Sequence, residues 1–278
     1  MPAPVRITIL FMPQFRYPFA LGGPYGYNSD HKTHDQYSLQ IMFQDSTPVF
    51  EFRGPLGIPV QIGSSLALLV AFYLFVAGAN LFSALIIVMM LLAAIFLHEL
   101  GHAWASEVQG VPVRRIVLYG GGGFCENKRS ATAYEQEFIV VMGPIVNLAL
   151  WALCSLGAYW LWEGIIADGS FVQIGRNAPI DPRITLAQHL ELFAMINGFL
   201  AVFNLIPVQP LDGGKLLHLI LLRLTHAEAA MKITGRIGLI LSVLWIPGLI
   251  FFYGMGWWIL FFIPSIPLHF AMARGRLA

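Results

Sequence analysis

Charged residues are scarce in this sequence. They make up 11% of the 278 residues, whereas hydrophobic residues make up 57% and the mean hydropathy is +0.70. Soluble domains typically contain about 25% charged and about 45–50% apolar residues. The core of a globular protein of this chain length could not bury so much apolar surface. The composition therefore excludes a water-soluble globule and predicts a polytopic membrane protein.

Cysteine and net charge are also low. Cys125 and Cys154 are the only cysteines. One lies in a glycine-rich stretch and the other in an apolar run, so we expect no structural disulfide. The formal net charge is +1, which gives no indication of nucleic acid or another polyanion as a partner. A secretory signal peptide is not expected, because Pro13 and Arg16 interrupt the short apolar segment near the N-terminus.

Long apolar runs predict an all-α membrane protein with about six transmembrane helices. No charged residue occurs from Gly54 to Leu97, a run about twice the roughly 20 residues that one span needs. The predicted spans lie near residues 60–78, 81–104, 137–162, 186–206, 236–253 and 257–271. After the second span, the sequence VRRIVLYGGGGF predicts a small membrane-associated β-hairpin or sheet, because β-branched residues precede four glycines.

Basic residues are unevenly divided between the two sides of this predicted topology. With six spans, fourteen of the sixteen lysines and arginines fall on one side, and only Arg176 and Arg183 fall on the other. Loops on the cytoplasmic side carry the excess of Lys and Arg. We therefore expect both termini to be cytoplasmic and His98 to lie in the cytoplasmic half of the second span.

Three ionisable residues interrupt the second span in the sequence HELGH at 98–102. Residues i and i+4 share one face of a helix, so His98 and His102 can direct two imidazoles at one point, as in the H-E-x-x-H zinc motif. Glu99 can then act as general base on a metal-bound water. The alternative is two buried, hydrogen-bonded histidines. Polar groups within a span need partners, and a divalent cation would satisfy all three.

A third metal ligand is required, and Asp212 is the candidate. It follows two prolines in the sequence FNLIPVQPLDGGK at 203–215, where the fourth span ends. The predicted topology puts the ends of the second and fourth spans on the same side, so Asp212 can lie at the depth of the two histidines. The alternative is that Asp212 is an ordinary N-cap of the following helix.

Four segments together resemble the site-2 protease family of intramembrane zinc metalloproteases. They are HELGH, the glycines at 120–123, GPIVN at 143–147 and FNLIPVQPLDGG at 203–214. The resemblance covers roughly residues 60–225. It implies an integral protein of a prokaryotic cell membrane that cleaves peptide bonds within or next to membrane-spanning segments. The implied partners are the lipid bilayer and a transmembrane substrate, either a single-pass protein or a signal-peptide remnant.

The resemblance also implies roles for individual residues. One zinc ion would be bound by His98, His102 and Asp212, and Glu99 would be the catalytic base. Gln209 departs from the family pattern, since many relatives carry another residue in this proline-rich turn. We find neither a PDZ-like insertion nor a pair of CBS domains.

Asn204 and the glycine stretch are the remaining candidates. An amide donor aimed at developing negative charge can be worth about 2.7–4 kcal/mol in acyl transfer, and the resemblance implies this role for Asn204; the alternative is capping of a broken helix end. Gly121, Gly122 and Gly123 could let an extended substrate pair with a strand edge. The alternative is a packing element without substrate contact. Asn147 and Asn197 are expected to form hydrogen bonds between helices.

The predicted organisation has three parts. Residues 1–58 would be a cytoplasmic or interfacial region of unknown role, 59–225 the catalytic membrane core and 226–278 a C-terminal two-span hairpin. Two other functions stay open. A metal transporter could use the same residues, although the chain has no internal repeat and transport needs no glutamate in the general-base position. A di-iron oxygenase would need more histidine pairs than the one HxxxH present.

Overall fold

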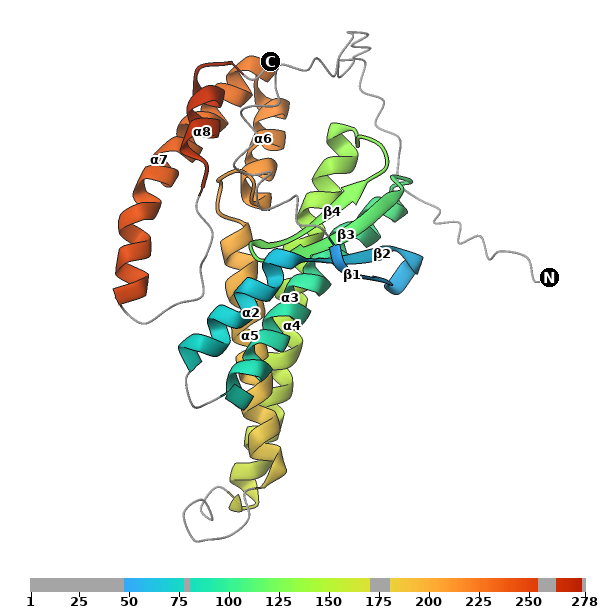
Figure 1. Ribbon diagram of the computed structural model, residues 1–278, viewed down its shortest axis with the longest axis vertical. Helices are drawn as coiled ribbons and strands as arrows, with labels where there is room; N and C mark the ends of the chain where they lie inside the picture. Colours follow the sequence, from blue (N-terminus) through green and yellow to red (C-terminus); the bar gives the residue numbers. More distant parts are fainter. Residues whose placement is uncertain (1–47, 78–80, 171–180, 255–263, 277–278) are drawn as a thin grey trace, which may run out of the picture. The chain divides into compact units, whose positions relative to one another are not determined.

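A computed structural model of the chain describes residues 48–77, 81–170, 181–254 and 264–276. This part of the chain is mainly helical and contains one four-stranded sheet (Figure 1). Residues 1–47 of the expected N-terminal region and residues 257–263 of the expected sixth span lie outside the described residues.

Four of the described helices are long and apolar enough to cross a membrane. They correspond to the second to fifth predicted spans and are α3 (Leu81–Val108), α4 (Ala133–Ala167), α5 (Pro182–Asn204) and α7 (Ala227–Gly254). With 28 residues, α3 is about 42 Å long at 1.5 Å per residue, which exceeds the roughly 30 Å of a hydrocarbon core. The chain is an integral membrane protein, as its composition predicts.

The first predicted span differs from expectation, and the sixth is described only from residue 264 onward. Strand β2 (Pro59–Gly63) occupies the start of the first, so helix α2 begins only at Ser64 and runs to Ala77. Val60 and Ile62 are β-branched and pair with a distant strand, and an apolar run does not by itself distinguish a strand from a helix. In the sixth, the described residues contain the eight-residue helix α8 (Ile266–Ala273).

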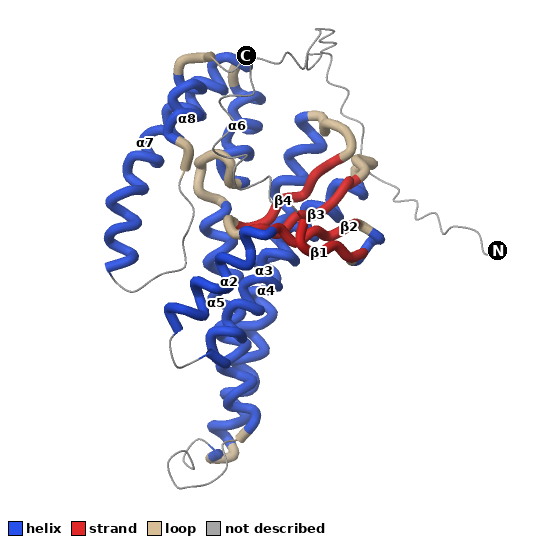
Figure 2. Tube along the Cα trace, viewed as in Figure 1, coloured by secondary structure: helices blue, strands red, loops and turns tan. Residues whose placement is uncertain are grey.

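The sheet is larger than the predicted hairpin. The hairpin itself is formed by β3 (Val113–Tyr119) and β4 (Gly122–Asn127), which are antiparallel. Strand β2 pairs parallel with β3, and β1 (Pro48–Arg53) pairs antiparallel with β2, which gives the order β1-β2-β3-β4 (Figure 2). Residues on both sides of the predicted boundary at 58/59 therefore belong to one sheet.

Polar side chains connect all four strands on one face of this sheet. Gln61 donates to Glu51 at 2.7 Å, and Arg115 donates to Gln61 at 2.7 Å and to Glu126 at 2.6 Å. Successive side chains of a strand point to opposite faces. The neighbours Val60 and Ile116 are accordingly fully buried, in a cluster with side chains of α2 and α3. The sheet is thus held against the membrane helices by its apolar face.

Close helix packing brings the two predicted motif segments together. A Cβ added at Gly101 would lie 2.9 Å from the carbonyl oxygen of Met142, so a larger residue there would push α3 away from α4. The N-terminus of α4 is held by a capping box between Thr132 and Glu135. The HELGH segment of α3 consequently lies directly against the GPIVN segment of α4.

Candidate metal centre

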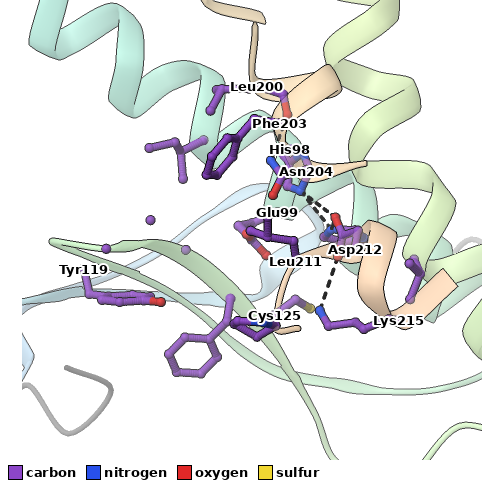
Figure 3. A pocket seen from close by; sticks show the side chains of 18 of the residues that line it. His98, Glu99, Tyr119, Cys125, Leu200, Phe203, Asn204, Leu211, Asp212 and Lys215 are labelled. Carbon is purple, nitrogen blue, oxygen red and sulfur yellow. Dashed lines mark hydrogen bonds and ion pairs between the residues drawn. The ribbon is translucent and has the colours of Figure 1, made fainter. Parts of the chain in front are cut away.

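Two histidines of α3 and one aspartate converge at a single point. The Nε2 atoms of His98 and His102 are 3.0 Å apart, and each is 3.1 Å from Oδ2 of Asp212 (Figure 3). All three residues are buried. Within the described residues they form a cluster whose ligand atoms all lie within 4.8 Å of one another. The two separate segments that the sequence singled out therefore meet.

The hydrogen bonds of the other ring nitrogens determine the tautomer of both histidines. Nδ1 of His102 is 2.7 Å from the carbonyl oxygen of Ile139, which can only accept, so this nitrogen carries the proton. Nδ1 of His98 is 2.5 Å from Oδ1 of Asn147. The amide nitrogen of Asn147 donates to Asn197 at 2.8 Å, which orients the amide with its oxygen toward His98. In the neutral form of each ring, which metal binding requires, Nε2 therefore has the lone pair.

Three electron-rich atoms thus face one another at about hydrogen-bonding distance. Such an arrangement is repulsive unless a proton or a metal cation lies among the atoms. Two imidazole nitrogens and one carboxylate oxygen form a donor set that zinc accepts, and catalytic zinc sites use three protein ligands and leave one position for water. Histidine ligands that donate their second nitrogen to an oxygen are typical of such sites. The residues therefore fit one divalent metal ion.

Gly143 of α4 packs against the two imidazoles. A Cβ at this position would lie 2.4 Å from Nε2 of His102 and 2.7 Å from Cε1 of His98. Real Cβ atoms essentially never approach other atoms to less than 3.0 Å. Only glycine at this position leaves the space in which the two rings lie.

A tightly packed turn positions Asp212. It is the first residue of α6 (Asp212–Leu224), and the N-cap is Leu211, so the alternative that Asp212 caps the helix is wrong. A Cβ at Gly213 would lie 2.1 Å from the carbonyl oxygen of Leu205, which explains the glycine after the aspartate. Lys215 holds the second carboxylate oxygen, Oδ1, at 3.2 Å. The first oxygen, Oδ2, is therefore directed at the histidines.

Glu99 lines the same cavity as His98, His102 and Asp212. The cavity has a volume of about 350 Å³ and is lined by residues of the sheet and of α2 to α6. Glu99 is buried, and a Cβ at Gly123 would lie 2.7 Å from its Cγ. Strand β4 thus passes directly over the glutamate. A carboxylate beside a metal site can accept a proton from a metal-bound water.

The other predicted site residues also line this cavity. Asn204, the last residue of α5, donates one amide hydrogen to the carbonyl oxygen of Leu200 at 3.0 Å, which leaves its second amide hydrogen for another acceptor. Gly121, Gly122 and Gly123 lie at the β3–β4 turn and the start of β4 and face the cavity. Within the described residues, β4 pairs with β3 alone, so its second edge carries no strand.

Two contacts of the centre were not anticipated from the sequence. Asn147 and Asn197 form the expected bond between α4 and α5, but Asn147 also contacts His98, and Lys215 also contacts Asp212. The spacing of Lys215 three residues after the aspartate on a helix is a signal that could have suggested the second contact. The first depends on which face of α4 meets α3, and this is not visible in the sequence.

Cys125 lines the cavity but is not an activated thiol. Burial, together with the nearby carboxylate of Glu99, raises the pKa of the Cys125 thiol to about 12. The thiolate is the nucleophilic form, so at neutral pH this residue is inert. Together with Cys154 it is a free cysteine, in agreement with the expected lack of a disulfide.

The family model described as Peptidase family M50 matches residues 85–178 and 169–245, a region that contains the whole cluster. The chain belongs to peptidase family M50. This membership confirms the resemblance to site-2 proteases. The matched region extends from α3 to α7, so the helices that build the metal centre are those that the family shares.

Individual relatives share between 27% and 31% of their residues with this chain over the aligned regions. A putative zinc metalloprotease of Synechocystis is 31% identical over 55% of this chain and 36% of its own length. A zinc metalloprotease of Methanocaldococcus jannaschii is 27% identical over 68% and 50%, and stage IV sporulation protein FB of Bacillus subtilis is 28% identical over 63% and 50%. The chain thus spans half or less of the length of these relatives.

A solved structure shares the fold. The site-2 protease from Methanocaldococcus jannaschii is 21% identical, covers 82% of this chain and 93% of its own, and superposes with a TM-score of 0.51. The predicted fold class, a helical membrane protein with a small sheet, is therefore confirmed.

Proposed function

We propose that this chain is a zinc-dependent intramembrane protease that hydrolyses peptide bonds within or next to the transmembrane segments of membrane-anchored proteins. One observation carries the proposal. Two imidazole nitrogens and a carboxylate oxygen meet within 3.1 Å, beside a buried glutamate, in a cavity among helices of membrane-spanning length. Membership of family M50 and the names of the zinc metalloprotease relatives support it.

The proposed roles follow from the contacts of each side chain. His98, His102 and Asp212 would hold the zinc ion. When bound, zinc supplies Lewis acidity that polarises a peptide carbonyl and makes a coordinated water acidic, with a pKa of about 7. Glu99 would accept a proton from the attacking water and donate it to the leaving amine. The free amide hydrogen of Asn204 donates to the carbonyl oxygen as negative charge develops there.

The substrate would bind along β4. A peptide bond within a helix is shielded by the hydrogen bonds of that helix, so the segment must become extended before it is cleaved. The second edge of β4 offers backbone hydrogen bonds to an extended segment, and Gly121, Gly122 and Gly123 allow close approach of its backbone beside Glu99. Single-pass proteins and signal-peptide remnants are the proposed substrates, because each presents one hydrophobic segment.

The proposed cellular setting is a prokaryotic cell membrane with both termini in the cytoplasm. It is supported by the position of fourteen of the sixteen basic residues on one side of the six-span topology. We further propose that residues 59–225 form the catalytic core, with 1–58 as a cytoplasmic or interfacial region and 226–278 as a two-span hairpin. The β1–β2 pairing contributes one strand from the first region to the sheet of the core.

Glu99→Gln tests the proposal against metal transport through the same residues. The variant keeps the size of the side chain but cannot accept the proton, so cleavage of a single-pass substrate in proteoliposomes should fall to background while zinc content stays at one ion per chain. Glu163→Gln, an exposed position on α4, is the matched control and should cleave at the wild-type rate. Cleavage by the Glu99→Gln variant at that rate, or zinc uptake into proteoliposomes by both variants, would contradict the proposal.

A further inference from the structure

A buried histidine outside the metal centre has no role in the proposed chemistry. His269 of α8 is fully buried and lies beyond residue 245, where the family match ends. Its ring fills a space on α7 that a glycine creates, because a Cβ at Gly238 would lie 1.9 Å from Cδ2 of His269. Gly235 allows a second close approach of α8, at the backbone nitrogen of Ala273. Helix α8 is thus seated on the glycine face of α7.

Both ring nitrogens of His269 have defined partners. Nδ1 is 2.8 Å from the carbonyl oxygen of Ser265 and 3.3 Å from the hydroxyl of Ser242. The carbonyl oxygen can only accept, so Nδ1 carries the proton and Nε2 has a lone pair. Nε2 accepts the backbone N–H of Gln209 at 3.1 Å. The ring therefore joins α8 to a turn sixty residues earlier in the chain.

That turn is in direct contact with the first turn of α6, which carries the metal ligand. A Cβ at Gly214 would lie 2.6 Å from the backbone nitrogen of Gln209 and 2.5 Å from the carbonyl carbon of Val208. Val208 is itself fully buried. Closely packed interiors transmit displacement because they contain little free space. A shift of the Val208–Gln209 backbone must therefore move Gly214 and, with it, Asp212.

We propose that His269 is a positioning residue for the metal centre: by holding the N–H of Gln209, it fixes the turn against which α6 presents Asp212. This inference rests on the proposed function, since it treats Asp212 as a zinc ligand. It gives the C-terminal helix α8 a part in the site, and it gives Gln209 a role through its backbone rather than its side chain. A histidine that touches neither metal nor substrate thereby sets the geometry of a ligand.

The test compares three full-length variants in detergent. His269→Leu removes the acceptor, His269→Gln restores one through its side-chain oxygen, and His226→Leu, at an exposed histidine between α6 and α7, is the matched control. Partners that orient metal ligands typically change metal affinity by about 10–100-fold. In His269→Leu, we expect zinc release to a chelator to be about tenfold faster. We also expect a decrease in kcat that is larger than any change in KM. The other two variants should behave as the wild type.

Hydrogen–deuterium exchange of the segment 205–212 gives a readout that needs no metal. Exchange should be faster in His269→Leu alone, and Gly238→Ala, which displaces the ring from its other side, should reproduce this effect. In a His269→Ala background, Gly238→Ala should have no further effect, because the added Cβ no longer meets a ring. Unchanged exchange in His269→Leu, or equal defects in His269→Gln and His269→Leu, would overturn the inference. A wild-type chain without zinc would instead refute the proposed function, and exchange would still decide whether His269 holds the turn.

Discussion

Replacement of Gly143 by alanine should weaken zinc binding without disrupting the helix. The new Cβ would meet Nε2 of His102 at 2.4 Å and Cε1 of His98 at 2.7 Å, so atoms must move by up to about 1 Å to reach ordinary contact distances. Metal ligands tolerate only about 0.2 Å. Overpacking of this kind costs about 1–3 kcal/mol, which corresponds to about a 5- to 150-fold loss of zinc affinity.

The same substitution should leave the fold intact. Within a helix, alanine is more stable than glycine by roughly 0.5–1 kcal/mol, so α4 itself loses nothing. Gly157→Ala on the same helix is the matched control, because its Cβ would make an ordinary contact at 3.4 Å with Leu190. Zinc affinity is measured by competition with a chelator, and the fold by thermal unfolding in detergent. If Gly143→Ala bound zinc within twofold of Gly157→Ala, the placement of the metal between the imidazoles would be refuted.

Three further outcomes are expected. Asn147→Leu removes the acceptor that orients His98 and should weaken zinc binding by about 10–100-fold in the same competition assay; wild-type affinity would contradict the tautomer argument. Because burial raises the pKa of Cys125 to about 12, only about 0.01% of it is thiolate at pH 8. Its alkylation by iodoacetamide, followed by mass spectrometry, should therefore become fast only as the pH approaches 12, whereas rapid modification at pH 8 would show the thiol to be activated. Arg223 of α6 forms an exposed ion pair with Glu137 of α4. Arg223→Ala should therefore lower the free energy of unfolding by less than about 1 kcal/mol. A larger loss in a denaturant titration would show that the pair anchors α6.

Local spacing explains why part of the centre was predictable. His98 and His102 share a helix face whatever surrounds them, because the helical repeat alone sets their relation. The start of the first predicted span is wrong for the opposite reason. The apolar residues of β2 resemble those of the helix that follows, but β2 is extended because it pairs with β3, more than fifty residues later. Pairing of this kind depends on a partner that local propensity does not see.

Composition and residue spacing were enough to establish that this chain lies in a membrane and that His98, Glu99 and His102 share one helical segment. These are properties of neighbouring residues, and they survive in any fold. Helix packing, in contrast, was needed to show that Asp212 meets His98 and His102, that Asn147 sets a tautomer, that Gly143 leaves room for the rings and that His269 contacts the turn before α6. These relations join segments that are far apart in the chain, and their distances are set by how closely the helices approach one another.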